Sequence, residues 1–224
     1  MIYYAVVKGE GDHMTLKKDA ASFIKVIVIG ILAGSLCAAL DLIPGENIWT
    51  FSSFSGSLGF WAISAMLVLM FSDTRILAGI NTFIYFAFMN TSFFFVHYML
   101  PFQFPRIPTL EDAAQQSLIW LIPSFICGIF ALITYQARKD TLPGTIALSL
   151  PCGLLLYECI SLYLSVFYNH KFLFQAIVDT AGLILLVVLF RKKKKKLWLA
   201  GLILLVAALL LGFNKFVNGT ILYY

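Results

Sequence analysis

Charged residues are scarce in this chain. They make up only 12% of the sequence, and 61% of the residues are hydrophobic. In soluble domains about a quarter of the residues are charged and roughly half are apolar. The mean hydropathy is +0.91, so the composition excludes an ordinary soluble protein and predicts an integral membrane protein. The apolar segments use nearly all of the 224 residues, which leaves no room for a separate soluble domain.

The chain also lacks the motifs of common enzymes. No Gly-x-Ser-x-Gly, His-Glu-x-x-His or Walker sequence occurs, and Ser55-Gly56-Ser57 has no histidine at matching depth. The four cysteines lie inside apolar segments without the spacing of metal ligands, which is typical of small hydrophobic residues. We therefore expect no enzyme activity, no catalytic residue, no metal and no cofactor.

Hydropathy predicts an all-α transmembrane bundle, because a spanning helix needs about 20 mostly apolar residues. We expect residues 1–21 to form a cytoplasmic N-terminal segment, residues 22–213 the transmembrane domain and residues 214–224 a short outer tail. The predicted domain contains seven spans: 22–43, 56–72, 76–99, 117–136, 144–167, 172–190 and 197–213.

Positive charge predicts how these spans are oriented. With the N-terminus inside and seven crossings, thirteen of the 16 Lys and Arg residues lie on the inner side, as the positive-inside rule requires. Only Arg106, Lys171 and Lys215 lie outside. The prediction is an N-in, C-out protein of the bacterial plasma membrane.

Six of the positive residues form one run directly after an apolar segment. This position indicates a topology anchor rather than a nucleic-acid site, so nucleic acid is not an expected partner. Binding of anionic lipid headgroups is the alternative. The run consists of Arg191, Lys192, Lys193, Lys194, Lys195 and Lys196.

The N-terminus contains no apolar core long enough for a signal peptide, so the first span is expected to remain as an anchor. Met14 is followed by Thr15, Leu16 and two lysines just before that span. Either Met1 or Met14 is the natural start.

Two features outside the spans carry predictions about local structure. Thr109 precedes Glu111 and Asp112, a pattern typical of a capped helix with an acidic first turn. The loop 101–116 is therefore either a lid with a short surface helix or, as we favour, a plain connector. Trp49, Phe51 and Phe54 in the loop before the second span are typical of an interfacial aromatic belt.

In the first span, Gly30, Gly34 and Ala38 form a stripe of small residues on one face. Such a stripe lets two helices approach closely. We favour packing within the chain over dimerisation, because six other helices are available as partners.

Two acidic residues lie within predicted spans, Glu158 in the fifth and Asp179 in the sixth. Ionisable groups at membrane depth are by default candidates for function. Counted from the turn between the two helices, both lie about ten residues deep, so they are expected to share one polar cavity. Desolvation and mutual repulsion limit the pair to at most one shared negative charge at neutral pH, unless a cation binds.

Polar residues accompany both carboxylates on the helical faces. Ser161 follows Glu158 by three residues and Gln175 precedes Asp179 by four, and Asn90 lies at similar depth in the third span. The predicted proton- or cation-binding residues are thus Glu158, Asp179, Asn90, Ser161 and Gln175. The alternative, weighted equally, is that the acids only join helices through hydrogen bonds.

The chain resembles a family of bacterial multi-pass membrane proteins known only as a domain of unknown function, over about residues 24–190. The resemblance rests on Ser57 and Trp61 at the start of the second span, the aromatic segment Phe93 to Tyr98, the segment Leu118 to Gly128, and Glu158 in a Gly- and Leu-rich helix. Relatives have an asparagine where this chain has Gly56. The family carries no assigned activity.

Two functions fit these observations. The first is a small-solute transporter or solute-binding membrane component that uses Glu158 and Asp179 as proton or cation acceptors. The second is a non-catalytic scaffold or subunit that binds another protein. The predicted partners are the lipid bilayer and an unknown small solute or protein.

Overall fold

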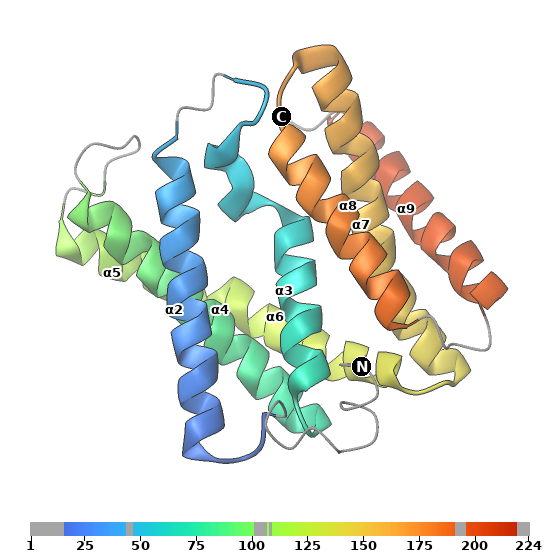
Figure 1. Ribbon diagram of the computed structural model, residues 1–224, viewed down its shortest axis with the longest axis horizontal. Coiled ribbons are helices and arrows are strands. Elements are labelled where there is room, and N and C mark those ends of the chain that lie inside the picture. The colour runs from blue at the N-terminus through green and yellow to red at the C-terminus, as the bar shows by residue number, and fades with distance from the viewer. Residues whose placement is uncertain (1–15, 44–46, 101–106, 108, 191–195, 219–224) are drawn as a thin grey trace. The chain divides into compact units, whose positions relative to one another are not determined.

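The computed structural model describes residues 16–43, 47–100, 107, 109–190 and 196–218 (Figure 1). The predictions about the start at Met1 or Met14, about the run 191–195 and about the last six residues lie outside these ranges. The described residues are helical apart from turns and one isolated bridge between Leu16 and Ser72. The all-α class is therefore confirmed.

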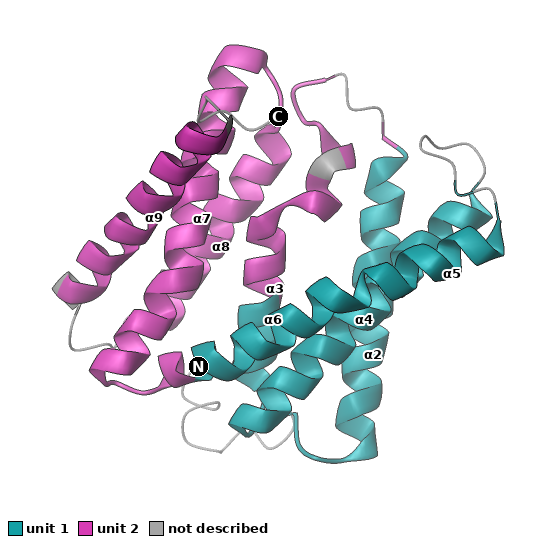
Figure 2. Ribbon diagram, turned by 180° about the vertical axis from the view of Figure 1, so that it is seen from behind, with its two compact units in different colours: residues 1–42, 65–135 teal, residues 43–64, 136–224 magenta. Residues whose placement is uncertain are grey.

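The chain divides into two compact units, which are coloured separately in Figure 2. Unit 1 consists of residues 1–42 and 65–135, and unit 2 of residues 43–64 and 136–224. The boundary passes through helix α3 (Leu58–Phe71), whose first turns belong to unit 2 and whose remainder belongs to unit 1.

Unit 1 is built around helix α4, which packs against both α2 and α6. Its helices are α2 (Ala20–Asp41), the end of α3, α4 (Arg75–Met99), α5 (Leu110–Ile119) and α6 (Leu121–Thr134).

Gly30 and Gly34 let α2 lie directly on the backbone of α4. A Cβ atom added at Gly30 would lie 2.6 Å from the Tyr85 carbonyl oxygen, and one at Gly34 would overlap the Met89 carbonyl. The stripe of small residues is thus used inside the chain, which confirms the prediction of internal packing.

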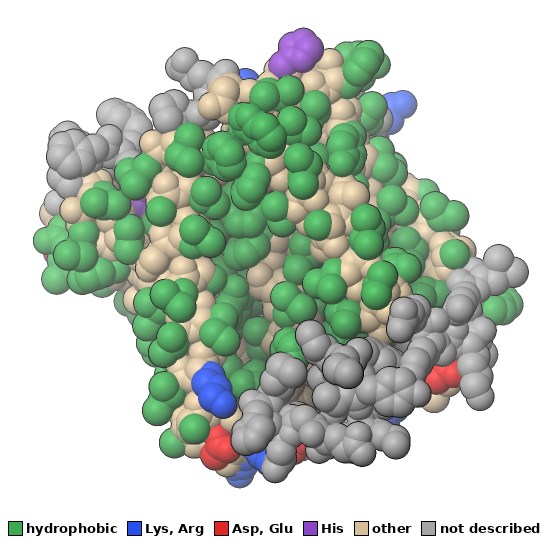
Figure 3. All heavy atoms as spheres, viewed as in Figure 1, with side chains coloured by type: hydrophobic (Ala, Val, Ile, Leu, Met, Phe, Trp, Pro, Cys, Tyr) green, Lys and Arg blue, Asp and Glu red, His purple; other side chains and the backbone are tan. Residues whose placement is uncertain are grey.

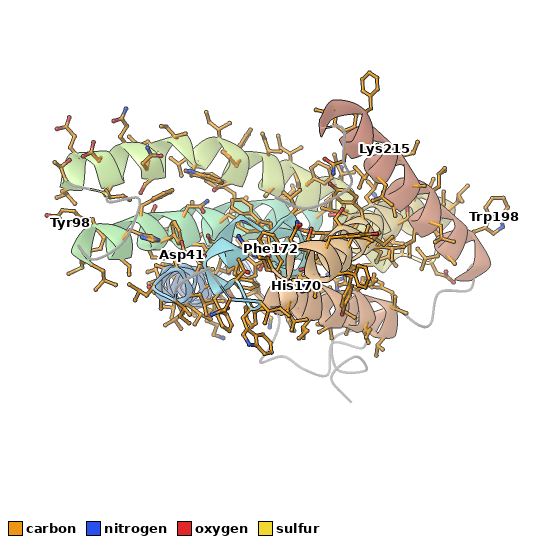
Figure 4. All side chains as sticks on the ribbon, turned by 90° about the horizontal axis from the view of Figure 1, so that it is seen from above. Asp41, Tyr98, His170, Phe172, Trp198 and Lys215 are labelled. Carbon is orange, nitrogen blue, oxygen red and sulfur yellow. The ribbon has the colours of Figure 1, made fainter. Side chains whose placement is uncertain are left out.

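Unit 2 contains the 3₁₀ helix η1 (Phe51–Gly56), the start of α3, and the helices α7 (Leu142–Asn169), α8 (Leu173–Leu189) and α9 (Lys196–Asn218). Helix α7 packs against both α8 and α9 (Figure 1). Figure 4 shows Trp198 near one end of α9 and Lys215 near the other. The helix runs to Asn218, five residues beyond the predicted last span, 197–213, and the outer tail from residue 214 stays a prediction.

The start of α8 is held by the loop that precedes η1. His170 and Phe172, which lie together at the turn between α7 and α8 (Figure 4), both adopt left-handed backbone angles. The Phe172 N–H donates to Thr50 Oγ1 at 3.0 Å, and the Leu173 N–H donates to the Ile48 carbonyl at 2.9 Å. The loop therefore satisfies N–H groups that the first turn of α8 leaves free.

Five helical stretches are long and apolar enough to cross a membrane: Ala20–Asp41, Arg75–Met99, Leu110–Arg138, Leu142–Asn169 and Trp198–Val217. The remaining two apolar helices are shorter, with 14 residues in α3 and 17 in α8. At 1.5 Å per residue, α3 is about 21 Å long and α8 about 25 Å, less than the roughly 30 Å of a hydrocarbon core. Five stretches thus have the length and composition of membrane spans, and the seven-span count stays a prediction.

The predicted second span, 56–72, corresponds to helix α3 within two residues at each end. The chain forms η1 up to Gly56, breaks at Ser57 and starts α3 at Leu58. The reason lies far away in the sequence: the N–H group freed at Leu58 and the Ser57 hydroxyl both donate to the side chain of Glu158.

The plain connector that we favoured before the fourth span is wrong over residues 110–116, which belong to α5, and the short helix of the alternative is present there. Thr109 caps this helix, since its hydroxyl accepts from the Asp112 N–H at 3.0 Å, and Glu111 and Asp112 lie in the first turn. The sequence pattern for the cap is confirmed. Residues 101–106 and 108 lie outside the described residues.

Candidate functional site

Glu158 and Asp179 lie in the same unit and converge on the first turn of α3. Both side chains are fully buried. The Leu58 N–H donates to Glu158 Oε1 at 3.0 Å, while the carboxyl group of Asp179 packs on Gly59, the next residue along. Both acids thus meet the start of α3, and the polar cavity that the sequence predicts between them stays a prediction.

Glu158 caps the start of α3, directly after the break that separates this helix from η1. Its Oε1 atom accepts from the Leu58 N–H at 3.0 Å and from the Ser57 hydroxyl at 3.3 Å. Ser57 Oγ in turn accepts from the Phe60 N–H at 3.4 Å, as an N-cap residue does. One carboxylate oxygen thus satisfies a backbone donor that a helix start leaves free, at the end where the helix dipole favours negative charge.

Asp179 reaches the same turn through Gly59. A Cβ atom at position 59 would overlap the carboxyl group of Asp179, so only glycine permits this approach. Gly182 lies about one turn after Asp179 on α8 and makes a similar close contact, because a Cβ atom at position 182 would overlap the side chain of Ile63. Two glycines on facing helices therefore hold α8 against the start of α3.

Several buried polar atoms at this site have no hydrogen-bond partner. They are Glu158 Oε2, both carboxylate oxygens of Asp179, and both the oxygen and the nitrogen of the Gln175 amide. Gln175 lies one turn before Asp179 on α8 and is fully buried. Unpaired buried polar atoms are rare and each costs about 1–3 kcal/mol, so their gathering around two acids requires an explanation.

An aromatic cluster joins this site to the loop before η1. Phe54 packs against Phe60 with ring centroids 4.6 Å apart and against Phe174 at 5.2 Å, and Phe51 packs against Phe174 at 4.7 Å. Phe54 is buried, so it does not lie in the interfacial belt that the sequence predicted. Phe60 follows Gly59 and Phe174 precedes Gln175, which places the cluster beside the carboxylates.

The other two predicted site residues have partners elsewhere. Ser161 is buried on α7, one turn from Glu158, and its side chain pairs with the hydroxyl of Tyr157. Asn90 belongs to unit 1, where its amide donates to Ser124 Oγ at 3.1 Å. The structure thus brings Glu158, Asp179 and Gln175 together, and it gives Asn90 a structural bond within its own unit.

Sequence reasoning missed Ser57, the Leu58 N–H and Gly59 as parts of the site. A weak signal was present, because Ser57 is a favoured N-cap residue before an apolar run. Nothing local links that signal to Glu158, which lies about a hundred residues later. Among the described residues, no group of three or more His, Cys, Asp or Glu side chains is placed to hold a metal ion.

No family model, curated protein or solved structure matches this chain. The resemblance to the uncharacterised family stays a prediction. Function is therefore argued from the geometry of the carboxylate site.

Proposed function

We propose that this protein is a multi-pass membrane transport component in which Asp179 and Glu158 accept a proton or a small cation. The observation that supports it is the set of unpaired oxygens on Asp179, Glu158 and Gln175 in a fully buried place. A proton or a cation supplies the positive charge that these oxygens lack, at little cost to the packing around them.

The two acids have different parts in this proposal. Glu158 Oε1 is bound by the start of α3, so this residue anchors the site. Neither oxygen of Asp179 has such a partner, so Asp179 is the primary acceptor and Glu158 Oε2 shares the bound charge. A broken helix whose N-terminus meets the ion site is a recurrent feature of secondary transporters.

The proposal includes seven crossings, with α3 crossing together with η1 as a broken helix, and a plasma-membrane location with the N-terminus inside. Irregular backbone at membrane depth is tolerated where it is buried in protein. Ser57, at the break, is fully buried, which supports a crossing at this point.

The competing function is a scaffold whose acids are purely structural. The capping of α3 by Glu158 favours it, because that contact alone explains why a glutamate lies at position 158. It leaves Asp179 and Gln175 without an explanation, and we therefore place it second.

The test is proton movement in proteoliposomes that enclose a pH-sensitive dye. Wild-type protein should change the internal pH when a sodium or potassium gradient is imposed, and Asp179→Asn should abolish this response. Asp73→Asn, a change at an exposed acid in a turn, is the matched control and should respond like wild type. An Asp179→Asn protein that is folded and as active as wild type would remove Asp179 from the mechanism.

A further inference from the structure

A groove on unit 1 has the chemistry of a lipid site. It lies between α2 and the part of α3 that belongs to this unit, and its volume is about 540 Å³, within the roughly 300–1,000 Å³ of typical ligand sites. Its walls are apolar, with Ile24, Val28 and Ile29 on α2 and Leu67 and Phe71 on α3. Such walls fit a hydrocarbon chain.

One charged side chain lines this groove, that of Lys25. It lies five residues into α2, about 7.5 Å from the start of the helix. A lysine at this depth extends its aliphatic stem along apolar surface and places its ammonium group at headgroup level. The groove thus has apolar walls and a positively charged end at Lys25, which we call its mouth.

The sequence around the mouth adds to the positive charge. Lys17 and Lys18 precede α2, Asp19 is the acid next to them along the chain, and Asp73, which follows the end of α3, donates its backbone N–H to the Leu16 carbonyl at 3.2 Å. Asp19 accepts from the Ser22 N–H at 2.7 Å, so it is engaged as the helix cap. In Figure 3, many hydrophobic side chains lie along α2, and Lys and Arg side chains lie beside Asp or Glu side chains near the end where this helix begins.

We propose that this groove binds one anionic phospholipid, with an acyl chain against α2 and α3 and the phosphate at Lys25. The excess of positive charge at the mouth selects an anionic headgroup over a zwitterionic one. The length of apolar wall selects a lipid over a free phosphate. This site is separate from the carboxylates and does not depend on their function.

Native mass spectrometry of the full chain in detergent tests the proposal, with phosphatidylglycerol and phosphatidylcholine of identical acyl chains as the probes. Wild type should retain phosphatidylglycerol preferentially. One charge at a membrane surface corresponds to about a fivefold change in affinity, so Lys25→Gln should lower this preference about fivefold. Lys25→Arg should keep it, and Lys171→Gln, a charge removed from unit 2, is the matched control.

A second variant tests the apolar walls independently. Val28 is half-exposed, so Val28→Trp should fold and fill the groove, and it should weaken binding of both lipids at the Lys25-dependent site. The proposal is overturned if wild type shows no preference, if the preference survives Lys25→Gln, or if Val28→Trp binds as wild type does. If soluble glycerol phosphate at equal concentration displaces the lipid, the site recognises the phosphate group alone and not the acyl chain.

Discussion

Asp179 and Glu158 illustrate how two buried acids in one bundle differ in their surroundings. Glu158 Oε1 has two donors from the start of α3, whereas Asp179 rests on Gly59 and neither of its oxygens has a partner. A hydrogen bond to a charged group contributes about 1.5–3 kcal/mol. Glu158 is therefore expected to matter for stability and Asp179 for ion binding.

This difference predicts distinct effects of truncation and of neutralisation at position 158. Glu158→Ala removes the acceptor for the Leu58 N–H and should lower the free energy of unfolding by about 2–4 kcal/mol. Glu158→Gln keeps an oxygen acceptor and should lose about half as much or less. Thermal melts in detergent compare the two, with exposed Glu111→Ala as control. Equal losses for the alanine and glutamine variants would contradict the capping role.

Gly59 carries a second prediction at this scale. Gly59→Ala places a methyl group where the Asp179 carboxyl group lies, and such overpacking typically costs about 1–3 kcal/mol. Gly201→Ala, with nothing within 4 Å of the added atom, should instead be neutral or stabilising. Combining Gly59→Ala with Asp179→Ala should recover part of the loss in a melting experiment. Additive losses would show that the two side chains do not meet.

At the scale of elements, the sequence predicts most helices but not the reason for their breaks. Hydropathy places α2, α4, α7 and α9 because each is a long apolar run with polar ends. The start of α3 after Ser57 carries a local N-cap signal, but the contact with Glu158 that holds it is made by a residue about a hundred positions later. The common depth and face of Glu158 and Asp179 could be predicted from helix geometry, whereas their meeting point on α3 could not.

The start of α2 gives a prediction about pH. The Ser22 backbone N–H, chiefly, and the nearby Lys25 and Lys17 hold the pKa of Asp19 below its usual range. A lowered folded-state pKa means that Asp19 contributes stability above the ordinary aspartate pKa and loses it as the pH falls through the lowered one. Asn caps helices about as well but does not titrate.

Wild type should therefore melt at or above the temperature of Asp19→Asn near neutral pH, and the difference should shrink in acid. Comparing the two melting curves across the pH range cancels the titration of every other group. A difference that stays constant down to the acid limit would contradict the contribution of Asp19.

At the scale of the whole molecule, the number of helices that cross the membrane decides which turns lie on which side. If α3 and α8 cross, the turn at Asp73 and the segment 139–141 lie on the N-terminal side of the membrane and Lys171 on the other. If only the five longer stretches cross, all three positions change sides. The charge bias favours seven crossings, whereas the lengths of α3 and α8, both shorter than a hydrocarbon core, favour five.

Cysteine labelling with a membrane-impermeant maleimide on intact cells distinguishes the two arrangements. Seven crossings with the N-terminus inside predict that Lys171→Cys is labelled from outside, while Asp73→Cys and Asp140→Cys react only after the cells are opened. The four native cysteines are first replaced, so that each reports alone. The reverse pattern would show that α3 and α8 do not cross.

The most direct test of the central proposal is the melting temperature of purified protein from about pH 5 to about pH 8, in sodium chloride or in choline chloride of equal ionic strength. In the proposed function the two buried acids share a positive charge, so wild type should lose stability toward the higher pH in choline and recover it in sodium or in acid. Asp179→Asn should fold and show neither effect. A wild type insensitive to both pH and cation, with Asp179→Asn markedly less stable under every condition, would contradict the account and leave the carboxylates as structural groups.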